Sequence, residues 1–126
     1  MATVLVVDDE PLIAMALEAA LEDAGYEVAT AANGRQGLER LAGAPRPDVV
    51  LLDMMMPVMG GAAMRAAMTA DPELRAIPVV VLSSLPEEAV RTRLDGVAAV
   101  LRKPCTAEQV LGAIEGVLGG AREAGA

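Results

Sequence analysis

Hydrophobic runs alternate along the chain with segments of mixed polarity. Short and almost continuously apolar runs lie at residues 4–7, 48–53, 78–82 and 97–101, and a weaker run lies at residues 26–30. Runs of this length without polar alternation are typical of buried strands in a parallel sheet. The pattern therefore predicts five strands.

The segments between these runs carry apolar residues at intervals of three or four, which is the spacing of a helix. The first segment begins at Pro11, a residue favoured in the first turn of a helix. Further helices are predicted after the cap residue Asn33, over residues 62–70, over residues 86–94 and from a capping box that begins at Thr106.

Five strand–helix units in this order predict an α/β fold, with a parallel sheet, right-handed crossovers and helices on both faces. No repeat or linker interrupts the pattern, so residues 1–118 are expected to form one domain. Two adjacent glycines favour a flexible C-terminal tail over residues 119–126.

Composition excludes several classes of function. The chain has 126 residues, is 54% hydrophobic and 22% charged, and carries a net charge of −8. This acidic balance leaves no basic surface for nucleic acids or anionic lipids. The chain has one aromatic residue, Tyr26, so it also lacks the side chains on which bases stack. With no histidine and only Cys105 as a thiol, it has no histidine-dependent catalysis, internal disulfide, or histidine or cysteine metal site.

The N-terminal apolar run is too short for a signal peptide or a membrane span, because it stops at Asp8. We therefore expect a cytoplasmic protein with no membrane partner and no DNA-binding domain.

Polar residues stand where four of the predicted strands end. Asp8 and Asp9 follow the first strand, Asp53 ends the third, Ser83 follows the fourth, and Lys103 follows the fifth. Lys103 is the only lysine in the chain. Open α/β sheets bind ligands at the carboxyl ends of their strands. If these strands are neighbours, the five side chains converge on one cleft.

Carboxylates gathered in one cleft repel one another, by about 4 kcal/mol for a pair about 4 Å apart at an effective dielectric of about 20. Such a cluster holds a proton or binds a cation, and an all-oxygen ligand set favours Mg²⁺. A carboxylate can then accept a phosphoryl group, whose oxygens a hydroxyl and a lysine can hold. Taken singly, each residue has a plainer interpretation as a helix cap, a turn or the end of a strand. The joint pattern indicates a phosphoryl-transfer site.

Over residues 3–118 the chain resembles the receiver domain of bacterial two-component response regulators. The resemblance rests on dispersed residues in the family's order and at its separations, namely Asp8, Asp9, Asp53, Met56, Pro57, Val58, Met59, Gly60, Gly61, Ser83, Lys103 and Pro104. It implies a flavodoxin-like (βα)5 three-layer sandwich whose five-stranded parallel sheet has the order 2-1-3-4-5.

The resemblance also implies a Mg²⁺ site and a phosphoacceptor. Asp53 would accept phosphoryl from a histidine kinase or histidine phosphotransfer protein. Asp9, Asp53 and the backbone carbonyl of Met55 would ligate Mg²⁺, and Asp8 would act mainly through a metal-bound water.

For the switch itself, the resemblance implies that Ser83 and Lys103 each hold a phosphoryl oxygen and that the Lys103–Pro104 bond is cis. Because Ser83 leads into the fourth helix and Lys103 ends the fifth strand, we expect phosphorylation to change the surface of the fourth helix, fifth strand and fifth helix, roughly residues 84–118. That surface would bind an unknown downstream protein or form a weak dimer of an otherwise monomeric chain.

Three positions depart from the family's usual pattern. Val100 stands where the family usually has Tyr or Phe, so no aromatic ring can rotate there. Cys105 replaces a common Phe, and Gly60 stands where an acid is frequent. We therefore expect the change to travel through residues 83–86 and the short helix after them.

Other functions stay open at this point. One is a small Mg²⁺-dependent aspartyl-phosphate phosphatase, although such enzymes usually have a second aspartate where this chain has Met55. Another is a phosphoryl sink or shuttle with no output of its own. A degenerate receiver is disfavoured by the complete site, and a flavodoxin-like electron carrier by the near absence of aromatic residues.

Overall fold

The computed structural model describes residues 2–43, 45–94 and 96–125. Five parallel strands form one sheet in the order β2-β1-β3-β4-β5. Their bounds are β1 Thr3–Val7, β2 Glu27–Ala31, β3 Val49–Asp53, β4 Val79–Ser83 and β5 Ala99–Arg102. The flavodoxin-like topology expected from the sequence is confirmed.

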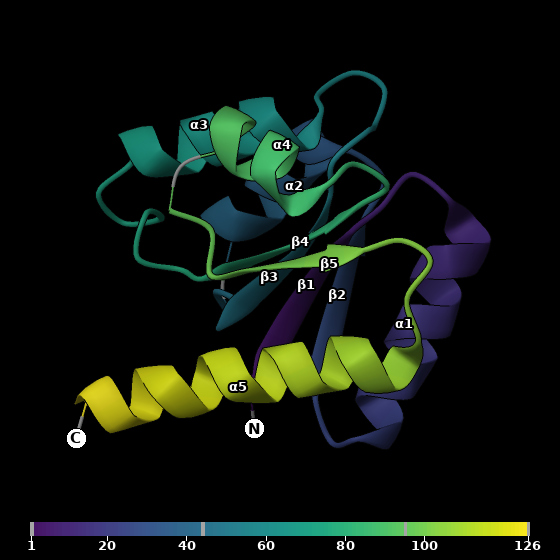
Figure 1. The fold of residues 1–126 in the computed structure, drawn as a ribbon. Helices are drawn as coiled ribbons and strands as arrows, with labels where there is room; N and C mark the ends of the chain where they lie inside the picture. Colours follow the sequence, from purple (N-terminus) through teal and green to yellow (C-terminus); the bar gives the residue numbers. More distant parts are fainter. Residues whose placement is uncertain (1, 44, 95, 126) are drawn as a thin grey trace.

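Five helices in the described part of the chain cover the two faces of this sheet. Their bounds are α1 Pro11–Asp23, α2 Gly34–Ala42, α3 Gly61–Ala70, α4 Glu87–Arg93 and α5 Ala107–Gly125. The helices α2, α3 and α4 lie on one face, and α1 and α5 lie on the other (Figure 1). Within the described ranges, no helix is both long enough and apolar enough to cross a membrane.

The sheet divides the hydrophobic core into two clusters, because successive side chains of a strand point to opposite faces. Leu52 of β3 packs with Met64 and Val90 in the cluster under α2, α3 and α4. Its neighbour Leu51 packs with Ile114 in the cluster under α1 and α5. The three central strands are therefore buried on both sides, which explains their uninterrupted apolar sequences.

The predicted helix caps are present. The Asn33 side chain accepts a hydrogen bond from the Gln36 N–H at 2.9 Å. At the start of α5, Thr106 and Gln109 cap each other: the Thr106 N–H donates to Gln109 Oε1 at 2.8 Å, and the Gln109 N–H donates to Thr106 Oγ1 at 3.1 Å.

Two element boundaries differ from the prediction by more than one residue. The last strand begins at Ala99 rather than residue 97. Just before it, the Ala98 N–H donates to the Val79 carbonyl, and the Val97 carbonyl accepts a hydrogen bond from Arg91 Nη1 at 3.3 Å. Helix α5 continues to Gly125, whereas the sequence predicts a tail from residue 119. Two glycines cost a helix about 1 kcal/mol each, and the good helix formers after them offset part of that cost. Residues 1 and 126, the ends of the predicted domain and tail, lie outside the described residues.

Candidate functional site

The sheet order places the carboxyl ends of β1, β3, β4 and β5 next to one another. Asp8 follows β1, Asp53 is the last residue of β3, Ser83 is the last of β4, and Lys103 follows β5. β1, β3 and β4 are apolar up to this edge, because their residues fill the core, and the chain becomes polar where it leaves the core. This edge of the sheet is the candidate site.

Lys103 links two of the predicted acids. Its Nζ donates to Asp53 Oδ1 at 3.0 Å and lies 3.9 Å from Asp8 Oδ2. The lysine side chain is 24% exposed, whereas the side chains of Asp8 and Asp53 are 1% and 6% exposed. The single lysine of the chain is therefore the counter-ion of two nearly inaccessible carboxylates. The expected cis peptide bond between Lys103 and Pro104 is present.

The two carboxylate oxygens of Asp8 differ in their hydrogen bonding. Its Oδ1 accepts the N–H of Glu10 at 2.9 Å. Its Oδ2 is buried and, within the part of the chain that the structure describes, has no hydrogen-bond partner. An unsatisfied buried carboxylate oxygen is costly. The arrangement therefore favours binding of a further positive group or donor at this point.

Burial and the pairing of Lys103 with Asp53 together set the pKa values of Asp8, Asp53 and Lys103. Desolvation raises the pKa of Asp53 and outweighs its hydrogen bond from Lys103, which acts in the opposite direction. Desolvation likewise raises the pKa of Asp8 despite its backbone hydrogen bond from Glu10 and the charge of Lys103. Burial alone would lower the pKa of Lys103, but its hydrogen bond and ion pair with Asp53 leave that pKa raised. Lys103 therefore stays protonated. The raised pKa of Asp8 and of Asp53 means that Lys103 alone does not offset the cost of burying both carboxylates.

A group of three acids beside β1 suits a metal ion. The carboxylate oxygens of Asp8, Asp9 and Glu10 lie within 4.8 Å of one another, and Asp8 is the buried member. An all-oxygen set with open positions fits Mg²⁺, and the unsatisfied Oδ2 of Asp8 is a ready ligand. Glu10 is a member that the sequence analysis missed, although its position directly after two aspartates could have indicated it.

Asp53 and Met55, the other two residues expected at the metal, are not in this group. Asp53 is held by Lys103, and Met55 lies in the loop after β3 with 67% of its surface exposed. Their roles as ligands stay predictions.

Ser83 lies at the site, but its hydroxyl faces a different partner. The side chain is buried, and Oγ accepts the N–H of Leu85 at 2.9 Å. This hydrogen bond holds the loop that leads into α4. A hydroxyl that accepts one hydrogen bond still has its own proton to donate.

The loop after Asp53 is tightly constrained. The Gly61 N–H donates to the Met54 carbonyl at 3.0 Å, and a Cβ at Gly61 would lie 2.7 Å from the Asp53 carbonyl oxygen. Glycine is therefore required where α3 begins. Val58 has a φ of +67°, a strained value for a β-branched residue, at the centre of a turn in which Met59 N–H donates to Pro57 O.

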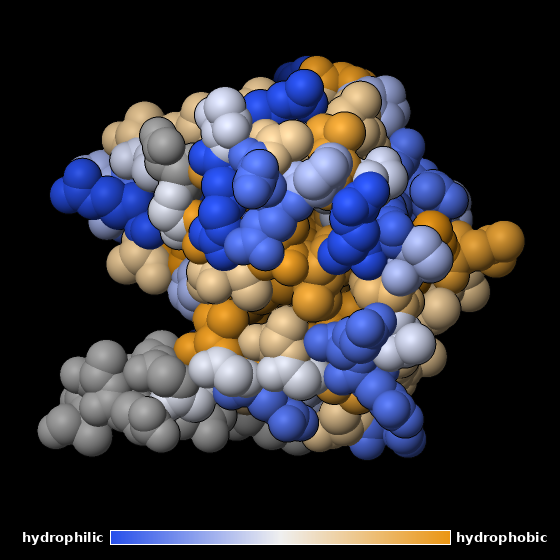
Figure 2. All heavy atoms as spheres, in the orientation of Figure 1, coloured by the Kyte–Doolittle hydropathy of each residue, from blue (hydrophilic) through white to orange (hydrophobic). Residues whose placement is uncertain are grey.

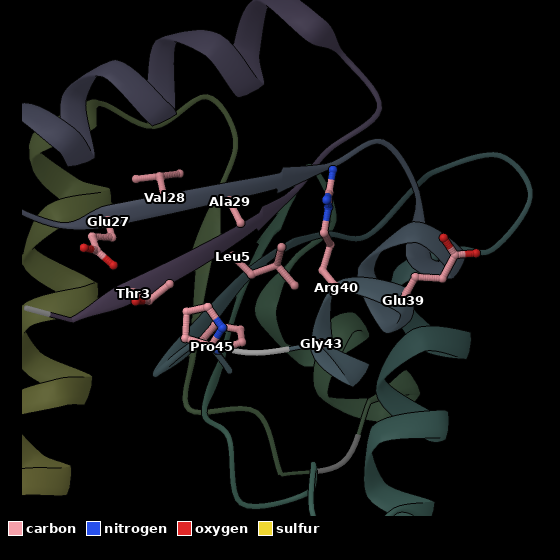
Figure 3. A pocket seen from close by; sticks show the side chains of 10 residues that line it. Thr3, Leu5, Glu27, Val28, Ala29, Glu39, Arg40, Gly43 and Pro45 are labelled. Atoms are coloured by element: carbon pink, nitrogen blue, oxygen red, sulfur yellow. The ribbon is translucent and has the colours of Figure 1, made fainter.

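One hollow lies beside this edge of the sheet, and another lies away from it. A groove of about 610 Å³ runs between α1 and the segment after β5, and Leu12, Ile13, Leu17, Leu82, Lys103 and Cys105 are among its lining residues. A cavity of about 390 Å³ lies over β2 and α2, where Arg40 and Glu27 are among the lining residues (Figure 3). That cavity contains none of the site residues. Arg40 Nε donates to the Thr30 carbonyl there, so the guanidinium covers the open edge of the sheet.

Comparisons with known proteins point in one direction. Residues 4–115 match the family model of the response regulator receiver domain. The chain is 38% identical to Protein PilH of Pseudomonas aeruginosa over 95% of this chain and 100% of PilH. It is 31% identical to the polar-differentiation response regulator DivK of Brucella anthropi over 94% of this chain and 98% of DivK.

The structure is similar to that of the chemotaxis response regulator CheY4 of Vibrio cholerae, with a TM-score of 0.86 and 34% identity over 93% of this chain and 98% of CheY4. Other relatives are longer, and the chain spans between 11% and 49% of their length.

Proposed function

The chain belongs to the response regulator receiver domain family, and from that premise we propose that it is a phosphoryl-accepting switch in a two-component phosphorelay. Asp53 is the phosphoacceptor, and the donor is a histidine kinase or a histidine phosphotransfer protein. Phosphorylation changes which protein the chain binds.

One observation carries this proposal. A buried carboxylate at the end of the central strand β3 is held by the only lysine, next to a second buried carboxylate with an unsatisfied oxygen. This arrangement has a nucleophile, a cation to hold the incoming charge, and a position for a metal. A phosphoryl group brings about −1.5 to −2 charges, which Lys103 offsets in part.

The reaction is a direct phosphoryl transfer. A carboxylate oxygen of Asp53 forms a bond to phosphorus, the bond from phosphorus to the donor nitrogen breaks, and its electron pair stays on that nitrogen. Lys103 lies within reach of Asp53 to pair with the phosphoryl oxygens. Ser83 then donates a hydrogen bond from its hydroxyl to another phosphoryl oxygen. This movement pulls on the loop that contains Leu85, whose N–H is bonded to the same hydroxyl.

Mg²⁺ is the metal that we propose for the acids. Asp8, Asp9 and Glu10 would hold it through carboxylate oxygens, together with Asp53 and the Met55 carbonyl that the family resemblance adds. When bound, the ion neutralises the cluster and polarises the phosphoryl group.

The surfaces beside the site suit protein partners. Leu12 and Met15 of α1 are 81% and 63% exposed next to the acids, and the apolar groove continues from Leu12 toward Lys103. We propose that the phosphoryl donor docks here. For the downstream target or a weak dimer we retain residues 84–118, where hydrophobic side chains over β5 lie between the more hydrophilic surfaces of α4 and α5 (Figure 2). A phosphoryl sink or shuttle would use the same chemistry without this second surface.

Labelling with a small acyl phosphate tests the proposal. The wild type should take up one phosphoryl group in Mg²⁺ and none in excess EDTA. Asp53→Asn should abolish the labelling, whereas the matched control Asp23→Asn, at an exposed position of α1, should label like the wild type. Equal labelling of Asp53→Asn would reject Asp53 as the phosphoacceptor.

A further inference from the structure

Arg65 is a buried charged residue outside the site. In the described part of the chain, four polar or charged side chains are buried, and three of them, Asp8, Asp53 and Ser83, form the site. The fourth is Arg65, in the middle of α3, with 5% of its surface exposed. A guanidinium is seldom buried without a specific partner, because its desolvation is costly.

One hydrogen-bond partner of Arg65 lies in the turn between α4 and β5. Its Nη2 donates to the Gly96 carbonyl at 3.2 Å. Gly96 has a φ of +65°, and a Cβ on it would lie 3.1 Å from the same nitrogen. The turn and the guanidinium are therefore closely fitted, so α3 fixes the position at which α4 ends.

Besides this contact and the hydrogen bond from Arg91 Nη1 to the Val97 carbonyl, α4 has few anchors. It has seven residues, of which Val90 is the buried one, and its ion pair between Arg91 and Glu87 is exposed to solvent. Its leading loop is held by the hydrogen bond from the Leu85 N–H to Ser83 Oγ. The helix is thus tied to the phosphoacceptor site at one end and to α3 at the other.

The two ties differ in strength. The Leu85–Ser83 hydrogen bond joins two neutral groups, whereas the Arg65–Gly96 hydrogen bond has a charged donor, and charged donors make bonds roughly twice as strong. Breaking it would also leave a buried charge without this acceptor. When the Ser83 hydroxyl turns to a phosphoryl group, the leading loop gives way first and the Gly96 end stays in place.

We propose that Arg65 is a positioning residue that pins the C-terminal end of α4 to α3, so that α4 responds to phosphorylation by pivoting about the Gly96 turn. The trigger in this proposal rests on the proposed function, but the pin exists without phosphorylation. Movement is then concentrated at residues 84–90 and small at residues 94–98. Arg65 selects the direction in which the signal leaves the site.

Amide hydrogen exchange of the full chain without Mg²⁺ or phosphoryl donor tests the pin. Arg65→Met should speed exchange at residues 91–98 about tenfold, with α5 unchanged. Arg65→Lys, which keeps the charge but loses the planar fork, should fall between the two and serves as the test if Arg65→Met does not fold. The exposed Arg75→Met has the same charge change and should match the wild type. Exchange at residues 91–98 within about twofold of wild type in both Arg65 variants would overturn the pin.

The pivot is tested by repeating the exchange with acyl phosphate and Mg²⁺. In the wild type, exchange should rise at residues 84–90 and stay unchanged at residues 94–98, and in Arg65→Met it should rise at both. A rise of equal size at both ends in the wild type would overturn the pivot. If the wild type takes up no phosphoryl group, the proposed function is wrong, while the phosphate-free comparison still decides whether Arg65 pins α4.

Discussion

The helices α3 and α4 lie on the same face of the sheet and follow the strands that end in Asp53 and Ser83, yet they are held in opposite ways. α3 begins in backbone contact with the phosphoacceptor strand and buries Met64, Arg65 and Met68. Three residues separate α4 from the end of β4, and α4 buries Val90. Local stability follows buried contacts, so the acceptor side of the site is rigid and the sensing side is compliant. A phosphoryl group bound between them would move the side that resists least.

The largest effect is expected from a substitution at the start of α3, the rigid side of the site. Gly61→Ala places a methyl group 2.7 Å from the Asp53 carbonyl oxygen and 3.0 Å from Met54 Cα, and both are backbone atoms that yield little. We expect a loss of about 3 kcal/mol in the free energy of unfolding, measured by urea titration. Gly112→Ala is the matched control. It lies in α5 with nothing within 4 Å of the new Cβ, and it should gain up to about 1 kcal/mol. Equal losses in the two variants would contradict the close approach at α3.

A second prediction concerns the buried charge of Asp8 in the site. The pKa of Asp8 is raised in the folded state, chiefly by burial, so its ionised form opposes folding above that pKa and the penalty disappears as pH falls through it. Without Mg²⁺ at pH 7, Asp8→Asn should therefore raise the free energy of unfolding by about 2 kcal/mol.

The difference between Asp8→Asn and wild type should shrink as the pH is lowered toward about 5, since protonation then relieves the wild type as well. Urea titrations in EDTA at both pH values measure this, with Asp23→Asn as the control for net charge. A gain that is independent of pH would show that the carboxylate charge is not its cause.

The smallest effect is expected from a substitution that loosens the loop before α4, the compliant side of the site. Ser83→Ala removes the acceptor of the Leu85 N–H, at a cost of about 1 kcal/mol. Amide exchange should quicken at residues 84–90 and remain unchanged across α3. The neighbouring Ser84→Ala, at an exposed position, is the control and should leave both helices unchanged. Faster exchange in α3 after Ser83→Ala would mean that the two helices respond as one unit.

The repeating apolar runs were sufficient to predict the sheet and its crossovers, because a parallel sheet buried on both faces leaves few other patterns. The boundaries of β5 and α5 were not predictable in the same way. Residues 97 and 98 are as apolar as the strand itself, so the sequence does not show that β5 begins at Ala99. α5 continues past adjacent glycines because helix propensity is summed over several residues, and no single pair of residues ends it.

The site was predictable in its residue types and in part of its geometry. Asp8, Asp53 and Lys103 come together because the ends of parallel strands meet, whatever their distance along the chain. The orientation of the Ser83 hydroxyl could not be predicted, since it depends on the loop before α4. Nor could the burial of Arg65, because an arginine among apolar residues on a helix reads as an exposed one until the turn at Gly96 is placed beside it.

The division of the core by the sheet has an evolutionary consequence. Side chains under α1 and α5 pack in one cluster and those under α2, α3 and α4 in another, and the two meet only through the backbone of the strands. Substitutions on opposite faces should therefore act almost additively on stability. Lineages can remodel the side chains under α1 and α5 without compensating changes beneath α4, and the converse holds as well.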